Sequence, residues 1–129
     1  MYCLDTNVVI DILRKNEQIR KKIEEISGVG EIYITTITLC ELYRGAYLSN
    51  KADYSLQIIN NFLTEVEMIN FDKDSCQEFG KIYTSLSKRG KITQELDLMI
   101  ASIAKVNNLV LITRDKEHFK NTDVKLEIW

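Results

Sequence analysis

Short runs of β-branched and apolar residues alternate along this chain with longer segments of helical period, and this alternation restricts the fold more than any other feature. We expect strands at 2–4, 32–35, 66–71, 109–113 and 126–129. The apolar spacing predicts helices at 7–14, 19–26, around 39–43, at 53–63, from 72 or 74 to about 88, and within 92–106. Such alternation predicts an α/β fold, a three-layer sandwich in which helices flank a central, mostly parallel sheet.

We expect one domain spanning residues 1–129. The composition is 45% hydrophobic and 28% charged, as in ordinary globular proteins. The chain has no proline, repeat or low-complexity tract to mark an internal boundary. No apolar run approaches the roughly 20 residues that a membrane-spanning helix needs, so no membrane association is expected.

The cysteines and the N-terminal residues predict a cytoplasmic protein. Cys3, Cys40 and Cys76 are odd in number and have no CxxC spacing, which favours free buried thiols in a reducing compartment. Residues 1–5 lack the basic start of a secretory signal. The net charge of −2 argues against nucleic-acid binding, unless acidic residues cluster around divalent cations that reverse the local sign.

Two acidic residues follow predicted strands. Asp5 comes directly after the first strand, and Asp115 follows the strand at 109–113. The carboxyl ends of parallel strands meet at one edge of a sheet, and ligand sites of open α/β sheets form there. We therefore expect these two carboxylates to lie at the same edge.

Asp97 and Glu41 lie within apolar helical segments. No cation stands three or four residues from Asp97, so this carboxylate should either have a raised pKa or bind something positive. Glu41 has Arg44 at i+3, which offers an ordinary salt bridge. Each acid alone is compatible with capping or ion pairing, but four together favour a carboxylate-rich site for Mg²⁺ or Mn²⁺.

Other common chemistries lack their residues. The single histidine, His118, cannot supply the ligands of a typical catalytic zinc site, and we expect it on the surface rather than in catalysis. The chain has neither the GxSxG of a nucleophile elbow nor a Gly-rich phosphate-binding loop.

Four segments resemble the motifs of the PIN-domain family. Residues 4–11 (LDTNVVID) resemble its opening signature, and residues 38–46, 90–101 and 113–119 are similar to its second, third and fourth acidic motifs. The ending LEIW at 126–129 is typical of VapC-type members. The resemblance covers essentially the whole chain, although the third segment lacks the proline that many relatives carry.

The resemblance implies the roles of seven residues. The expected catalytic and metal-binding quartet is Asp5, Glu41, Asp97 and Asp115. The residues expected to orient ligands or water are Thr6, Asn7 and Thr113. Relatives carry either aspartate or asparagine at the position of Asp115. Asp11 also matches the opening motif, but Arg14 and Lys15 follow it at helical spacing, so a solvated ion pair is expected there. Glu95 is a further candidate acid.

The function implied is that of an Mg²⁺- or Mn²⁺-dependent endoribonuclease, the toxin of a toxin–antitoxin pair. The implied partners are an RNA substrate, a cognate VapB-type antitoxin and a second copy of the chain, with residues 19–26 and 53–63 as candidate dimer surfaces. Basic residues flank the acidic motifs and are candidates for phosphate contacts: Arg44, Lys91, Arg114 and Lys116. Tyr43 and Tyr47 are candidates for base stacking.

Two alternatives remain open at this point. A phosphatase of the haloacid-dehalogenase type also places an aspartate after its first strand, but it needs a second aspartate two residues on, where this chain has Asn7. A non-catalytic interaction module would keep the same fold without binding metal.

Overall fold

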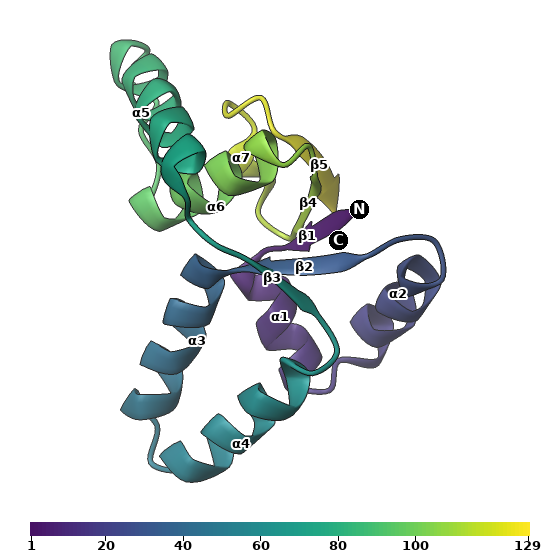
Figure 1. Ribbon diagram of the computed structural model, residues 1–129. Helices are drawn as coiled ribbons and strands as arrows, with labels where there is room; N and C mark the ends of the chain where they lie inside the picture. The colour runs from purple at the N-terminus through teal and green to yellow at the C-terminus, as the bar shows by residue number, and fades with distance from the viewer.

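The computed structural model describes all 129 residues and contains one five-stranded sheet (Figure 1). The strands are β1 (Tyr2–Leu4), β2 (Ile32–Thr35), β3 (Glu67–Ile69), β4 (Val110–Thr113) and β5 (Lys125–Ile128). They lie in the order β3-β2-β1-β4-β5, and every neighbouring pair is parallel. The expected α/β fold is therefore confirmed, and its sheet is wholly rather than mostly parallel.

Seven helices flank the sheet. They are α1 (Thr6–Leu13), α2 (Glu17–Ser27), α3 (Thr36–Leu48), α4 (Ala52–Phe62), α5 (Lys73–Lys88), α6 (Glu95–Val106) and α7 (Lys116–Phe119). The helix expected within 92–106 is α6, which begins at Glu95. Gly90 has a φ of +63° and ends α5, and Gln94 is still extended, so the residues between them connect two helices.

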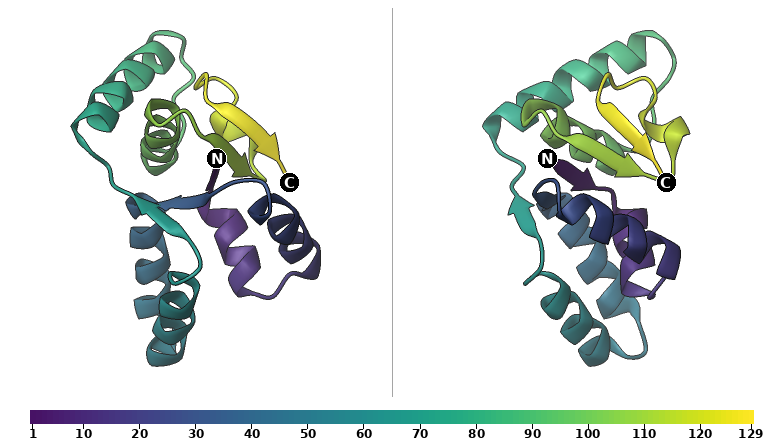
Figure 2. Two further views of the ribbon diagram at one scale, coloured as in Figure 1. Left: turned by 45° about the vertical axis from the view of Figure 1, so that its right-hand side comes forward. Right: turned by 90° about the vertical axis from the view of Figure 1, so that its right-hand side faces the viewer.

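The central strands β1 and β4 are apolar on both faces, which explains why helices cover both. Leu4 and Ile112 point to one face and pack with α1, α2, α3 and α4. Their neighbours Cys3 and Leu111 point to the other face and pack with α6 and α7. Adjacent residues of a strand face opposite sides, so two buried layers require uninterrupted apolar strands. Figure 2 shows α1, α3 and α4 on one side of the sheet and α5 and α6 on the other.

Strand order reverses between β1 and β4. From β1 the chain continues to β2 and β3 on one side, and it then crosses to β4 and β5 on the other side. The register places Leu4 opposite Ile112, so these two strands end together. A crevice outside the carboxyl ends of strands at such a reversal is where open α/β sheets bind ligands. The segments that follow β1 and β4 both begin there.

The structure corrects the expectation that all three cysteines are buried. Cys3 is buried in the sheet, but Cys40 and Cys76 are exposed, because they lie on the solvent-facing sides of α3 and α5. All three are free thiols. None of the helices combines the length and apolar character that crossing a membrane would require.

Candidate active site

Asp5 is fixed where β1 becomes α1. Its backbone N–H still pairs with Ile112 O of β4 at 2.9 Å, and its side chain caps α1 by accepting from Thr6 N at 2.8 Å. The residue is only 3% exposed. Its carboxylate is thus held rigidly at the strand reversal, as the position after the first strand predicts.

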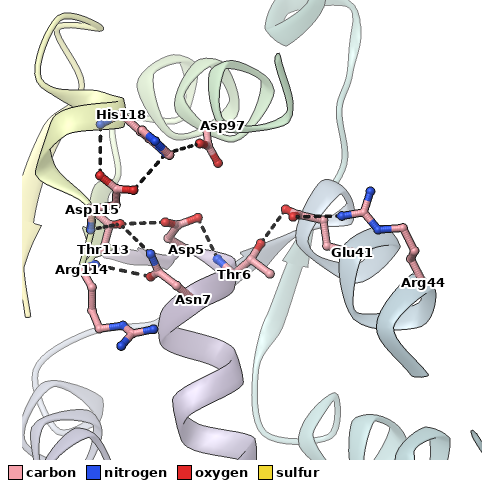
Figure 3. Close-up of polar contacts among 10 residues, drawn as sticks. All are labelled: Asp5, Thr6, Asn7, Glu41, Arg44, Asp97, Thr113, Arg114, Asp115 and His118. Atoms are coloured by element: carbon pink, nitrogen blue, oxygen red, sulfur yellow. Dashed lines mark hydrogen bonds and ion pairs between the residues drawn. The ribbon is translucent and has the colours of Figure 1, made fainter. Parts of the chain in front are cut away.

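Thr113, the last residue of β4, holds the second oxygen of Asp5. Its hydroxyl donates to Asp5 Oδ2 at 2.7 Å and accepts from Asp115 N at 3.0 Å and from Asn7 Nδ2 at 3.4 Å (Figure 3). A hydroxyl has one proton and two acceptor sites, so these three bonds use its full capacity. Because both acceptor sites are occupied, the Thr113 proton is directed at Asp5.

Burial raises the pKa of Asp5 from 3.8 to about 6. Desolvation is the largest cause, and the hydrogen bonds from Thr113 and from the Thr6 backbone oppose it. The negative charges of Asp97 and Glu41 raise this pKa further. Three of the four candidate acids are thus close enough to act on one another electrostatically.

The Glu41 side chain on α3 is held more firmly by Thr6 of α1 than by Arg44 of its own helix. Thr6 Oγ1 lies 2.8 Å from Glu41 Oε1 and 3.0 Å from Thr38 Oγ1. An ionised carboxylate can only accept, so the Thr6 proton goes to Glu41 and Thr38 donates to Thr6. The expected Arg44 partner is present, but it lies 3.7 Å from Glu41 and its side chain is 63% exposed, which makes it a weak ion pair.

His118 bridges the other two acids. Its Nδ1 lies 2.8 Å from Asp97 Oδ2 on α6 and 3.0 Å from Asp115 Oδ2, and Figure 3 shows the ring between both carboxylates. Asp115 also caps α7 by accepting from His118 N at 3.3 Å. His118 was expected on the surface rather than in catalysis; its side chain is 37% exposed, but it also contacts two of the candidate acids. The short helix α7 follows Asp115 directly and turns the ring back toward α6.

The pKa of Asp97 is raised, as its apolar surroundings predict. Burial is the main cause, and the charges of Glu41 and Asp115 add to it, whereas His118 lowers it by charge and by hydrogen bonding. All four candidate acids are thereby linked in one electrostatic group. No three His, Cys, Asp or Glu side chains are arranged to hold a metal ion directly, so the group is not a closed ligand cage.

Asn7 and Asp11 organise the loop after β4. Asn7 Oδ1 accepts from Arg114 N at 3.3 Å. Arg114 Nε lies 3.0 Å from Asp11 Oδ2, an ion pair whose angles fall outside those of a hydrogen bond. Asp11 was expected to pair with Arg14 or Lys15 of its own helix, and this expectation is wrong. Asp11 is a buried residue on the inner side of α1, where only the loop after β4 brings a cation.

A comparison with known protein families identifies the family of this chain. The model of the PIN domain matches residues 2–125. The chain belongs to the PIN domain family. Because the match spans both halves of the sheet, all four acidic segments of this PIN domain lie within it.

Curated relatives and solved structures agree with this family. The chain is 30% identical to Ribonuclease VapC2 of Haemophilus influenzae, with 99% of this chain and 97% of the relative covered. It is 27% identical to the tRNA(fMet)-specific endonuclease VapC of Shigella flexneri, over 99% and 97% of the two chains. Among solved structures, VapBC2 from Rickettsia felis bound to a promoter DNA fragment matches with a TM-score of 0.95 at 29% identity, covering 99% of this chain and 98% of that chain.

Two residues of the site, His118 and Thr38, were not predicted from the sequence. His118 stands three residues after Asp115, and the four-residue helix α7 brings the two side chains into contact. So short a helix has no periodic pattern in the sequence. Thr38 is fully buried and lies three residues before Glu41. Its place in the TITLCE segment directly after β2 was the available signal. Glu95, the further candidate acid, is exposed.

Proposed function

We propose that this PIN domain is a divalent-metal-dependent endoribonuclease and acts as the toxin of a toxin–antitoxin pair. The observation that carries the proposal is the electrostatic coupling of acids from four separate segments at the strand reversal. Carboxylates gathered in a partly buried group are unfavourable by themselves, and a cation would relieve their repulsion. The likeness to ribonucleases of the VapC type supplies the reaction class.

The donor set fits Mg²⁺ or Mn²⁺. All four carboxylates offer oxygen, which these ions prefer. We assign Asp5 and Asp97 as the principal ligands because burial holds them, with Glu41 and Asp115 completing the site. Mg²⁺ commonly binds through one or two carboxylates and keeps several waters, so an open group of this kind suits it better than a closed cage. When bound, the ion supplies Lewis-acid chemistry that stabilises charge on the phosphate during hydrolysis.

The polar residues hold the acids in place by hydrogen bonds. Thr113 directs its proton at Asp5 and so favours the charged carboxylate. Thr6 donates a hydrogen bond to Glu41 from the first turn of α1 and so fixes the orientation of that carboxylate. Asn7 ties Thr113 to the backbone of Arg114, which keeps the segment after β4 against α1. Positioning by these three residues is the protein's own contribution to catalysis.

The family resemblance extends to partners. Several solved relatives are toxin–antitoxin complexes, among them VapBC2 from Rickettsia felis and VapBC-1 from nontypeable Haemophilus influenzae. We therefore propose a cognate antitoxin and an RNA substrate for this chain, acting in the cytoplasm, where its three free thiols would stay reduced. A homodimer, which the resemblance to the family implies, is proposed as well.

An RNA cleavage assay tests the nuclease. Wild-type protein is expected to cut RNA with Mg²⁺ or Mn²⁺ and to stop when EDTA is added. Asp97→Asn should abolish cleavage, whereas Asp74→Asn, the same change at an exposed acid on α5, should leave it intact. Cleavage that survives EDTA, or wild-type rates from Asp97→Asn, would contradict the proposal.

A further inference from the structure

Beside the acidic group lies a polar cavity of about 560 Å³. Seven of its eight lining residues are polar or charged, and they come from two segments, 91–94 and 117–121. His118 is one of them, and its ring also contacts Asp97 and Asp115. The cavity therefore adjoins the candidate active site through a shared side chain.

Hydrogen bonds hold the two segments that line this cavity in place. Gly90, with its positive φ, lets the chain turn at the end of α5, and Lys91 N then donates to Leu86 O at 2.8 Å. Arg89 Nη2 donates to Asn121 O at 3.1 Å, which ties the first wall to the second. The walls are therefore joined by a hydrogen bond and keep their spacing.

The charge inside the cavity suits a phosphate. Lys120 is already paired with Glu117, but Lys91 is exposed and makes neither an ion pair nor a side-chain hydrogen bond. An RNA strand must approach four carboxylates in order to be cut, and their charge repels its phosphates. A free ammonium at the edge of the site offsets this repulsion and adds an ordinary phosphate contact.

The amides of the cavity suit a base. Gln94 occupies the N-cap of α6 but makes no capping hydrogen bond, so its side chain is free to contact a ligand. Asn121 uses its backbone oxygen for Arg89, and its amide makes no hydrogen bond within the protein. Side-chain amides carry both donors and acceptors, and in RNA-binding proteins such groups read the exposed edges of unstacked bases.

We propose that this cavity binds one nucleotide of the RNA strand next to the scissile phosphate. Lys91 contacts its phosphate, and Gln94 contacts the edge of its base. The inference rests on the proposed nuclease function, and it assigns to 91–94 and 117–121 the choice of nucleotide beside the cut.

Binding, measured without cleavage, tests the subsite. The probe is a set of short fluorescein-labelled single-stranded RNAs of A, C, G or U, titrated with Asp5→Asn protein in EDTA and followed by anisotropy. Adding Lys91→Gln should raise Kd by about 5- to 10-fold for all four RNAs and make the salt dependence shallower by about 0.7 in log–log slope, as expected for one lost phosphate contact. The matched control, Lys21→Gln on exposed α2, should change neither quantity.

Gln94→Ala tests the base contact separately. Its expected effect is to narrow the difference in Kd among the four RNAs by several-fold, while the salt slope stays unchanged. Equal effects of Lys91→Gln and Lys21→Gln, or no RNA binding at all, would overturn the subsite. If wild-type protein cuts RNA and these variants still bind normally, the subsite alone is wrong. If the RNAs bind as expected but wild-type protein cuts none, the proposed nuclease function fails and the binding cavity stands.

Discussion

The hydroxyl of Thr113 donates a hydrogen bond of 2.7 Å to Asp5 Oδ2, which joins the carboxyl ends of β4 and β1 at the strand reversal. The two residues are 108 positions apart in sequence. This contact connects the polar positions that follow β4 to the most deeply buried of the four acids. It makes the orientation of Asp5 depend on a side chain that carries no charge.

Thr113→Val should therefore impair the site without removing an acid. The valine cannot donate to Asp5 or accept from Asp115 N, so the pKa of Asp5 should rise above its value of about 6. Metal affinity and cleavage rate should fall roughly 10- to 100-fold, the usual cost of losing a residue that orients a ligand. Thr113→Ser keeps the hydroxyl and serves as the control. Equal activity of the valine and serine variants would show that this hydrogen bond does not matter.

The pKa of Asp5 also makes a prediction about folding in EDTA. Asp5 titrates near 3.8 when unfolded and near 6 when folded, so between these values the folded state binds more protons. Its contribution to the free energy of unfolding is therefore full at low pH and is lost as pH rises through about 6. Relative to Asp5→Asn, wild type should lose on the order of 3 kcal/mol between about pH 4 and 7.

Urea unfolding of both proteins across this pH range measures that difference. The asparagine side chain of the variant does not titrate, so subtracting the two curves removes the contribution of groups that do not interact with Asp5. A difference that stays constant with pH would mean that Asp5 is not protonated more readily in the folded state.

His118→Ala should change the titration of Asp97. His118 lowers the pKa of this carboxyl, whereas Asp115 and Glu41 raise it. Removing the ring leaves Asp97 and Asp115 facing each other without a donor between them, so the pKa of Asp97 should rise further. NMR titration of ¹³C-labelled aspartate carboxyls in metal-free protein detects this shift. An unchanged or lower Asp97 pKa would show that the bridge has no electrostatic effect.

Thr6 and Arg44 hold Glu41 to different extents. Thr6→Val removes the hydrogen bonds that Thr6 Oγ1 makes with Thr38 and Glu41, so the free energy of unfolding should fall by about 1–3 kcal/mol. Arg44→Ala removes a long, exposed ion pair and should cost about 0–1 kcal/mol. Denaturation of both variants, with Thr6→Ser as control, compares them. A larger loss of unfolding free energy in Arg44→Ala than in Thr6→Val would show that Arg44, not Thr6, holds Glu41 more firmly.

The strands and the placement of the acids follow from the sequence because they depend on local pattern. Uninterrupted apolar runs such as residues 109–112 predict a doubly covered parallel sheet, and parallel strands bring Asp5 and Asp115 to one edge without knowledge of the tertiary contacts. Asp97 was recognisable because no cation stands three or four residues from it in the sequence.

The partners of the site residues could not be predicted in the same way. His118 on α7 contacts Asp97 on α6. Arg114, in the loop after β4, contacts Asp11 on α1, which lies more than 100 residues earlier in the sequence. Both pairs depend on how α6, α7 and α1 pack around the sheet edge, whereas helical spacing favoured the neighbours Arg14 and Lys15. Local periodicity describes one element at a time and carries no information about such contacts.

A crystal structure of the protein with Mn²⁺ tests the central claim most directly, because the anomalous signal locates the ion independently of activity. The expected result is a peak bound by oxygens of Asp5 and Asp97, which disappears in Asp5→Asn crystals grown with the same Mn²⁺ concentration. No peak at the strand reversal, or a peak that persists unchanged in Asp5→Asn, would contradict the assignment of these acids as the metal site.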